Sequence, residues 1–487
     1  GRVQSAAVKI IIDRDRLRAN FSRTKFFDLK VELSKTDSQK TFSANLFKLD
    51  EKKIATSNDF NSQTGEIKTK DITLLSENQA NQLCKELNSD SWSIIDVNEK
   101  PRTSNPKPPF TTSTLQQEAA RKLRSSARQT MSTAQKLYEN GFITYMRTDS
   151  THLSNEALSG SRDIIKNLYG NDYLPDNAIQ YSTKVKNAQE AHEAIRPAGD
   201  IIHPKKLKSK LDEKEWKLYD LIWKRTVASQ MKSAKIMNTV VSIKANDCLF
   251  EARGKAIEFP GFLSIYNEST DSKKEEDTTL PILNKKDELK LESIDGKQHF
   301  TKPIGRFTEA SLVKELEALG IGRPSTYATI MDKIQLKYIN KVNGAMVPNF
   351  SAYAVVQFLE SNFEDLVDLQ YTAGLEDNLD QISNNKMDYI NFLNGFWFGD
   401  DSVKGLNSLL NRDIDIGSSK LIKQYSINDD TYELKIGKFG VYIDNNGKTT
   451  NVYDDIAPDQ LNEDKILELF SESEKTEEPI AVDIKSN

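Results

Sequence analysis

The chain has 487 residues, of which 37% are hydrophobic and 29% are charged, and this length predicts three or four domains of about 100–200 residues each. No apolar run approaches the roughly 20 residues of a membrane helix and no signal peptide opens the sequence, so we expect neither a membrane protein nor a secreted one. The two cysteines, Cys84 and Cys248, lie far apart, which excludes a zinc ribbon within this chain and fits a reducing, cytoplasmic compartment.

Charge is distributed unevenly along the chain. The formal net charge is −5, but residues 451–487 alone hold 11 acidic and 3 basic residues. Residues 101–150 instead hold 8 Lys and Arg against 3 Asp and Glu. Such a basic segment is typical of a surface that meets phosphates, although a solvated charged face is the more common explanation from composition alone.

The first part of the chain predicts one helix followed by β-structure. Ser76 and Gln79 have the spacing of a capping box, which predicts the start of a short helix. In chain order we expect a helix over 6–21, paired strands over 26–54, a helix near 76–88, a strand over 92–97 and an extended proline-rich hinge over 101–109.

Residues 110–230 predict a mainly helical unit, after which alternating strand patterns return over 232–300. A helix from about Ser126 to Asn140 is expected to stop at Gly141. The apolar run after this glycine predicts a strand, which would place Tyr145 and Arg147 on one face. A phenol beside a permanent cation suits attack on a phosphodiester, although a Tyr-x-Arg pair alone is more often an ordinary surface pair.

His192 and Arg196 lie four residues apart and are expected on one face of a helix that Pro197 ends. A zincin motif is excluded because Arg196 stands where a second histidine would be needed. A histidine and a guanidinium on one face suit proton transfer and phosphate contact. A purely structural histidine is the alternative.

Helical patterns return after residue 306. Thr308 can cap a helix that runs to Leu319, a second helix is expected after Ser325, and Asn343-Gly344 predicts a hairpin turn. Two helices and a hairpin resemble a winged helix-turn-helix.

Further helices are expected over 352–363, 374–384 and 387–410. The last carries Tyr389, Phe392, Phe396 and Trp397, which we expect in the core rather than stacked on bases.

Three strings far apart in the chain together resemble the type IA DNA topoisomerases of the bacterial topoisomerase I kind. They are Phe142 to Leu153, Gln189 to Pro197, and Arg306 to Ser311 continued by Gly320 to Ala328. The opening Gly1 to Ser5 resembles a DNA-contacting string of the family, and Leu434 to Ile443 resembles its cysteine-free C-terminal repeat. The resemblance covers most of residues 1 to about 400, and Gly-Arg-Pro-Ser-Thr-Tyr at 322–327 favours topoisomerase I over topoisomerase III.

The resemblance implies a reaction and its residues. Tyr145 would attack one DNA strand, retain its 5′-phosphate and release a 3′-hydroxyl, so that strand passage and religation relax negative supercoils without ATP. Arg147 and His192 are the other implied catalytic residues. The implied DNA contacts are Gly1, Arg2, Val3, Gln4, Ser5, Gln135, Tyr138, Thr144, Arg196, Arg323, Ser325, Thr326 and Lys337.

The implied fold is mixed α+β and multidomain with a toroidal architecture: mainly helical DNA-gate and winged-helix-like domains joined by a β-rich hinge domain. The expected divisions are 1–24 for the first part of a helical DNA-binding domain, 25–105 and 232–300 for the hinge domain, 106–231 for the nucleophile domain, 301–412 for the winged-helix-like domain, and 413–487 for the C-terminal repeat and acidic tail.

The family's Mg²⁺ is held by the acidic residues of a toprim domain, which is absent from this sequence, so we expect no metal ligands in this chain. We interpret Asp13-Arg14-Asp15 and Asp413-Ile414-Asp415 as ordinary surface charge. The expected partners are DNA, preferably single-stranded, and a toprim-bearing segment in cis or in trans, with no membrane partner. We expect a monomer in the cytoplasm, at the nucleoid.

Two alternatives to the enzyme core stay open. One is a single-stranded DNA-binding fragment or split subunit that is inactive without its toprim partner. The other is a structural nucleic-acid scaffold, which is disfavoured because Tyr145, Arg147, His192 and Arg196 are all present.

Overall fold

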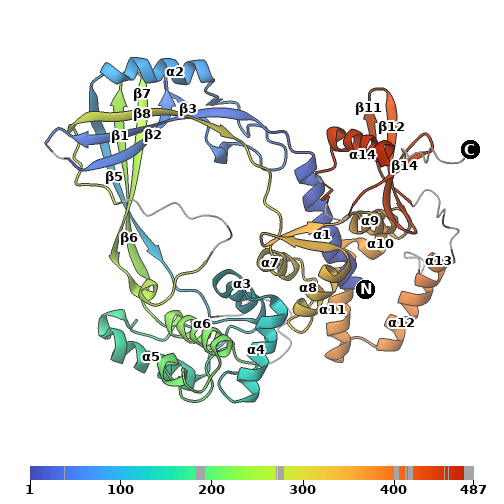
Figure 1. The fold of residues 1–487 in the computed structure, drawn as a ribbon. Helices are drawn as coiled ribbons and strands as arrows, with labels where there is room; N and C mark the ends of the chain where they lie inside the picture. Colours follow the sequence, from blue (N-terminus) through green and yellow to red (C-terminus); the bar gives the residue numbers. More distant parts are fainter. Residues whose placement is uncertain are drawn as a thin grey trace, which may run out of the picture.

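The chain forms an eight-stranded sheet, two helical units and a small C-terminal sheet (Figure 1). This computed structural model describes residues 1–37, 39–181, 192–269, 271, 279–399, 405–411, 414, 420–453, 456–458 and 460–476. Asp413 and Asp415, which the sequence predicts as surface charge, therefore lie outside the described part, as do residues 189–191 of the second family string.

The sheet has the strand order β1-β8-β5-β6-β7-β2-β3-β4; its long strands are antiparallel, and the short β3 and β4 pair in parallel. β1 also pairs with β2, so the six long strands close on themselves. Alternate side chains such as Leu29, Val31 and Leu33 are fully buried in the core of this sheet, as a period of two requires. The strands are β1 (Lys25–Lys35), β2 (Thr41–Leu49), β3 (Lys52–Ile54), β4 (Ile72–Thr73), β5 (Trp92–Ser104), β6 (Ala234–Ala245), β7 (Cys248–Phe259) and β8 (Glu288–Phe300), and α2 (Glu77–Glu86) packs against β1 and β8.

The residues between β5 and β6 form a helical unit, the insertion unit, because β6, β7 and β8 return to the sheet that the chain left after β5. Phe110, Leu137, Ile143 and Ile222 share its fully buried core. Its helices are α3 (Thr112–Leu123), α4 (Ala127–Glu139), α5 (Asn155–Tyr169) and α6 (Glu213–Ser229).

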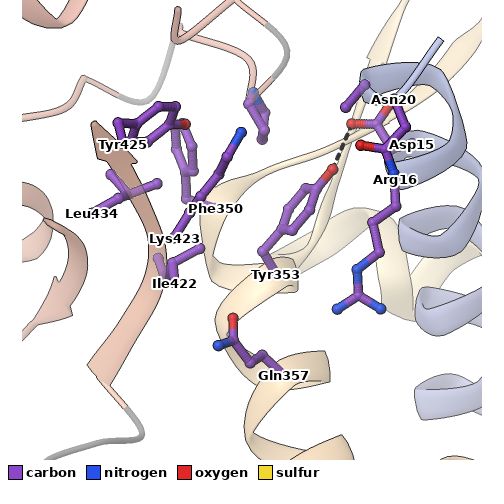
Figure 2. A pocket seen from close by; sticks show the side chains of 12 residues that line it. Asp15, Arg16, Asn20, Phe350, Tyr353, Gln357, Ile422, Lys423, Tyr425 and Leu434 are labelled. Atoms are coloured by element: carbon purple, nitrogen blue, oxygen red, sulfur yellow. Dashed lines mark hydrogen bonds between the residues drawn. The ribbon is translucent and has the colours of Figure 1, made fainter. Parts of the chain in front are cut away.

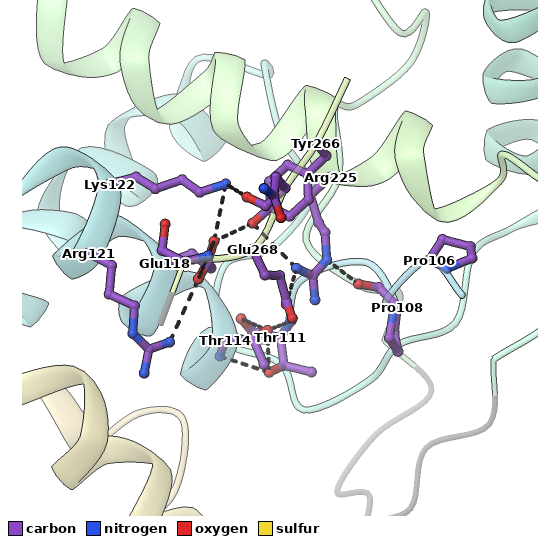
Figure 3. A network of polar contacts seen from close by, with 12 residues as sticks. Pro106, Pro108, Thr111, Thr114, Glu118, Arg121, Lys122, Arg225, Tyr266 and Glu268 are labelled. Carbon is purple, nitrogen blue, oxygen red and sulfur yellow. Dashed lines mark hydrogen bonds and ion pairs between the residues drawn. The ribbon is translucent and has the colours of Figure 1, made fainter. Parts of the chain in front are cut away.

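Buried polar contacts hold the segment after β5 and the segment after β7 against the insertion unit (Figure 3). The Arg225 guanidinium, which is 3% exposed, donates from Nε to the Pro108 carbonyl at 2.6 Å and from a terminal nitrogen to Glu268 at 2.6 Å. The Tyr266 hydroxyl donates to Glu118 Oε2 at 2.6 Å, and burial raises the pKa of this phenol. One cation on α6 therefore joins the segment leaving β5 to the segment that follows β7.

The second helical unit, the platform unit, packs α1 against helices from residues 309–383. The predicted cap is confirmed: Thr308 Oγ1 accepts from the Ser311 N–H at 3.1 Å. Asn343 and Gly344 have φ values of 50° and 83°, which make the predicted hairpin turn. The elements are α1 (Arg2–Ala19), α7 (Glu309–Ala318), α8 (Tyr327–Lys337), β9 (Ile339–Val342), β10 (Ala345–Pro348), α9 (Phe350–Asn362), α10 (Glu364–Val367) and α11 (Leu369–Ser383).

Asp15 of α1 is not ordinary surface charge. Its side chain is 2% exposed and accepts hydrogen bonds from Arg306 Nε at 3.0 Å and the Tyr353 hydroxyl at 2.8 Å. Asp15 and Tyr353 border a pocket between α1, α9 and the C-terminal sheet (Figure 2). The surface prediction was wrong because α9 and the segment before α7 cover this face of α1.

The predicted aromatic core over 387–410 is also wrong. α12 (Tyr389–Phe398) has no buried residue, and Tyr389 and Trp397 are 57% and 42% exposed. The rings of Phe392 and Phe396, one helical turn apart, stack on each other with their centroids 6.2 Å apart. α13 (Leu406–Leu410) follows α12.

Residues 421–451, where the sequence predicts the C-terminal repeat, form a four-stranded antiparallel sheet in the order β11-β12-β13-β14. Phe350 and Ala354 of α9 belong to its hydrophobic core, so this sheet packs directly on the platform unit. The strands are β11 (Leu421–Ile427), β12 (Asp430–Gly437), β13 (Gly440–Asn445) and β14 (Lys448–Asn451), and α14 (Glu463–Thr476) covers them.

The insertion and platform units also touch each other, α3 against α7 and α4 against α8. Figure 1 shows the sheet on one side, the insertion unit below and the platform unit opposite. Each unit therefore contacts or continues directly into the other two.

Candidate active site

A glycine turn after α4 sets the position of Tyr145. Ser126 caps the start of α4, and Gly141 beyond its end takes φ +75°, a left-handed conformation that favours glycine. The Phe142 N–H then donates back to the Leu137 carbonyl at 2.8 Å. These contacts confirm the predicted end of the helix and fix the direction in which the chain approaches Tyr145.

Two short extended segments pair in antiparallel orientation beside this turn. The Thr144 N–H donates to the Arg196 carbonyl at 2.9 Å, and the Arg196 N–H donates to Thr144 Oγ1 at 3.0 Å. The predicted strand after Gly141 is wrong in extent, because it forms only the single bridge Ile143 to Pro197. The apolar run pairs with one other extended segment instead of joining a sheet.

Tyr145 lies between two aromatic side chains that come from different segments. Its ring centroid is 5.3 Å from that of Tyr138, with an angle of 67° between the ring planes, and 5.5 Å from that of His192, with an angle of 63°. Both contacts are edge-on. Tyr145 and His192 are half-buried, whereas Arg147 is exposed. The structure thus brings the predicted nucleophile and the predicted histidine together, with Arg147 accessible two residues further along.

The predicted helix over His192 to Pro197 is wrong, since residues 192–197 are extended. Arg196 is 6% exposed and donates to Glu193 Oε2 from Nε at 2.9 Å and from a terminal nitrogen at 2.5 Å. Glu193 Oε1 also accepts from the Ser154 N–H at 2.7 Å. Burial acts to raise the pKa of Glu193, but the bonds from Ser154 and Arg196 outweigh it and hold that pKa below its usual value.

The Glu193–Arg196 ion pair gives Arg196 a positioning role in this structure. It holds the His192 segment against the N-terminus of α5, where the partial positive charge of the helix favours a carboxylate. As a DNA contact, Arg196 stays a prediction.

Asp149 is a member of the site that the sequence reading missed. Burial raises the pKa of its carboxyl, against the lowering effect of its own backbone N–H and of the Arg323 guanidinium. Asp149 is half-buried and lies in the same segment as Tyr145 and Arg147. The signal was available, because Asp149 stands two residues after Arg147 in the same string.

Two predicted DNA contacts are engaged by acidic residues of α11. Arg323 donates to Asp380 Oδ2 from Nε at 2.9 Å and from a terminal nitrogen at 2.8 Å. Arg2 donates from Nε to Glu376 at 2.7 Å. The side chains of Asp380 and Glu376 are 7% and 4% exposed, so both ion pairs join parts of the platform unit.

Comparison with known proteins decides the family of this chain. The sequence profile described as DNA topoisomerase matches residues 1–394. The chain belongs to the type IA DNA topoisomerases. It is 42% identical to DNA topoisomerase 1 of Synechocystis over 99% of this chain and 54% of that protein, and 40% identical to DNA topoisomerase 1 of Mycolicibacterium smegmatis over 97% of this chain and 55% of that protein.

A solved structure supports the same assignment. Full-length topoisomerase I from Thermotoga maritima matches with a TM-score of 0.71 and 29% identity, over 94% of this chain and 71% of that one. The resemblance read from the three strings is therefore confirmed, as is a mixed, multidomain fold. The chain spans about half the length of the curated topoisomerases that it matches.

The remaining predicted DNA contacts fall into two groups in this topoisomerase chain. Gln135 and Tyr138 lie exposed on α4 beside the Tyr145 turn, and Gln135 donates to Glu139 at 2.8 Å. The others belong to the platform unit or to the paired extended segments: Gly1, Val3, Gln4 and Ser5 at the start of α1, Ser325 and Thr326 before α8, Lys337 at the end of α8, and Thr144, whose Oγ1 donates to the Ala194 carbonyl at 2.7 Å.

The family typically uses Mg²⁺, and the acidic residues present here do not fit such an ion. Within the part of the chain that the structure describes, no three His, Cys, Asp or Glu side chains come together as a possible metal site. Three of the acidic residues around the site, Glu193, Glu376 and Asp380, are paired with arginines. Among the same residues, no helix is long and apolar enough to cross a membrane.

Proposed function

We propose that this chain is the strand-cleaving and DNA-gating core of a type IA topoisomerase. The observation that carries the proposal is the edge-on contact between Tyr145 and His192, which the fold assembles from two of the three family strings. The proposed divisions are those expected from the sequence: residues 1–24 and 301–412 for DNA binding, 25–105 and 232–300 for the hinge, 106–231 for the nucleophile domain, and 413–487 for the C-terminal repeat and tail.

In the proposed reaction the Tyr145 phenol oxygen attacks a phosphorus of one strand. The bond from phosphorus to the 3′-oxygen breaks, the 5′-phosphate stays on Tyr145, and the released 3′-oxygen takes up a proton. Arg147, exposed and permanently cationic, would stabilise charge on the non-bridging oxygens. His192 would contact the phosphate and assist proton transfer beside the phenol.

Strand passage would follow from the arrangement of the units. We infer that the sheet, the insertion unit and the platform unit form the toroid of the family, with the closed circuit of contacts as support. Separation of the insertion unit from the platform unit would open a gap for the second strand, and reversal of the attack would reseal the first. The proposed partner is single-stranded DNA, in the bacterial cytoplasm.

The test uses single-stranded oligonucleotides that carry a label on one end. A 3′-end label should stay with the protein on a denaturing gel, whereas a 5′-end label should be released, because only the 5′-phosphate side is held. In the presence of a toprim-bearing polypeptide that completes the enzyme, Tyr145→Phe should abolish the adduct while single-strand binding persists. The matched control is Tyr138→Phe, which changes the neighbouring ring and should leave the adduct.

The second candidate is a subunit that binds single strands but turns over only with a toprim-bearing partner. It is favoured by the lack of a possible metal site among the residues described. We expect no magnesium-dependent relaxation of supercoiled plasmid by this chain alone, and relaxation after a toprim-bearing polypeptide is added. A gel assay with and without that partner checks this, and relaxation by the isolated chain would contradict it.

A further inference from the structure

We infer that Glu309 is the latch that holds α4, the helix that leads into the Tyr145 turn, against the platform unit. This inference rests on the proposed gating function and goes beyond it by naming the contact that must break. Glu309 is the first residue of α7 and is 5% exposed. Its Oε2 accepts a hydrogen bond from the backbone N–H of Ala127 at 2.9 Å, across a sequence separation of 182 residues.

The contact lies at the N-terminus of α4, where backbone N–H groups lack helical acceptors and carry partial positive charge. Ala127 is the first residue of α4, and its side chain is 2% exposed within the hydrophobic core of the platform unit. Glu309 thus supplies an acceptor and a negative charge from another unit. Separation would expose the N–H, the carboxylate and an apolar side chain together.

Contacts within the platform unit hold the Glu309 carboxylate in place. Lys341 of β9 donates to Glu309 Oε1 at 2.8 Å, and Gln335 of α8 donates to the same oxygen at 3.4 Å. One oxygen therefore faces the platform unit and the other faces α4. The latch is preformed on the platform side, so its release costs only the contact with α4.

The same division of donors and acceptors repeats along the interface, or seam, between the insertion and platform units. Ser113 Oγ of α3 donates to Glu317 Oε2 of α7 at 2.7 Å, and Arg128 of α4 donates to Asp332 of α8 at 2.9 Å. In each case the insertion unit provides the donor and the platform unit the carboxylate. Glu309 differs from the exposed Arg128 pair because it is buried and therefore little screened by salt.

α4 connects the Glu309 contact at its first residue to the Tyr145 site beyond its last residue. A helix of 13 residues is about 20 Å long, and this one carries Tyr138 near its other end, shortly before Tyr145. Release of Ala127 would let α4, Tyr138 and Tyr145 move with the insertion unit as one body. Glu309 is therefore a positioning residue for the gate and has no part in phosphoryl chemistry.

The test is a distance measurement between spin labels on the full 487-residue chain. Labels at Lys136→Cys on α4 and Lys333→Cys on α8 use exposed positions on the two sides of the seam, in a Cys84→Ser background with Cys248 buried. The chain with Glu309 should give mainly one short distance. Glu309→Ala should raise the ratio of long to short distances about tenfold, the scale of losing a charge-assisted hydrogen bond.

Two further variants separate the latch from general damage. Glu309→Gln keeps an acceptor but loses the charge, so it should fall between Glu309 and Glu309→Ala and also carries the test if the alanine variant does not fold. Glu315→Gln removes one charge from the same helix away from the seam and should match the unsubstituted chain. Unchanged distances in both Glu309 variants, or equal opening by Glu315→Gln, would overturn the latch.

Adduct formation on labelled single strands is measured in parallel. If the chain with Glu309, supplied with a toprim-bearing polypeptide, forms no adduct, the proposed function fails whatever the distances show. If adducts form but the Glu309 variants stay closed, only the latch fails.

Discussion

Tyr145, Tyr138 and His192 are three aromatic side chains whose contact depends on two tight backbone features. One is the left-handed Gly141, and the other is the antiparallel pairing of the Thr144 and Arg196 segments. The family string identified Tyr145 and His192, but their edge-on geometry could not be predicted, because the segments are about 50 residues apart and their pairing depends on packing.

At the scale of single residues, Arg323 has a structural duty that its DNA-binding prediction did not include. It pairs through two nitrogens with Asp380, whose side chain is 7% exposed. Arg323→Ala should lower the free energy of unfolding by about 3 kcal/mol, because a buried carboxylate loses its partner. Urea denaturation checks this.

The double variant Arg323→Ala with Asp380→Ala is the control for that measurement. It removes the orphaned charge and should recover part of the loss. An unchanged midpoint for Arg323→Ala alone would mean that the arginine serves DNA only.

At the scale of elements, local signals predicted helix ends better than they predicted helical faces. The capping box at Ser76, the helix cap at Thr308 and the turn at Asn343 were predicted correctly, because each depends on neighbouring residues alone. The spacing of His192 and Arg196 led to a wrong prediction of a helix. In the structure this segment is extended, and a salt bridge between Glu193 and Arg196 stabilises it. α12 misled because apolar spacing does not reveal whether another element covers a helix.

The cap of α7 has a measurable contribution. Thr308→Ala removes the acceptor for the Ser311 N–H and should lower the free energy of unfolding by about 1 kcal/mol. Thr308→Ser keeps the hydroxyl and should retain most of the stability. Thermal unfolding of both variants checks this, and equal loss in both would assign the effect to the lost methyl group.

A salt bridge between α1 and α9 predicts a pH dependence. Hydrogen bonds from Arg16 and Lys9 lower the pKa of Glu360 from 4.5 to about 2. Because this pKa is depressed on folding, its stabilisation is present above about pH 4.5 and is lost as pH falls through about 2.

Glu360→Gln should therefore cost about 1 kcal/mol at pH 7, with solvent screening of a partly exposed pair taken into account. The difference from the unsubstituted chain should shrink between pH 4.5 and 2. Urea midpoints at pH 7, 4 and 3 provide the measurement. A difference that does not depend on pH would show that the ion pair is not the source.

At the scale of the whole molecule, the seam between the insertion and platform units was beyond sequence reasoning. Its contacts, such as Ser113 to Glu317 and Ala127 to Glu309, join residues about 200 positions apart. Alternating patterns did predict that the chain returns to β-structure after residue 232, and β6 to β8 do pair with the earlier strands. Periodicity reports which face of an element is buried, but it does not report the partner.

The most direct measurement of the central claim is to map the nucleotide-bearing peptide after trapping on a single-stranded oligonucleotide. Trypsin should release residues 137–147, which contain both Tyr138 and Tyr145, and fragmentation then assigns the modified side chain. We predict the nucleotide on Tyr145 in the unsubstituted chain and in Tyr138→Phe, and none in Tyr145→Phe. A nucleotide on Tyr138, or an adduct that survives Tyr145→Phe, would contradict the account.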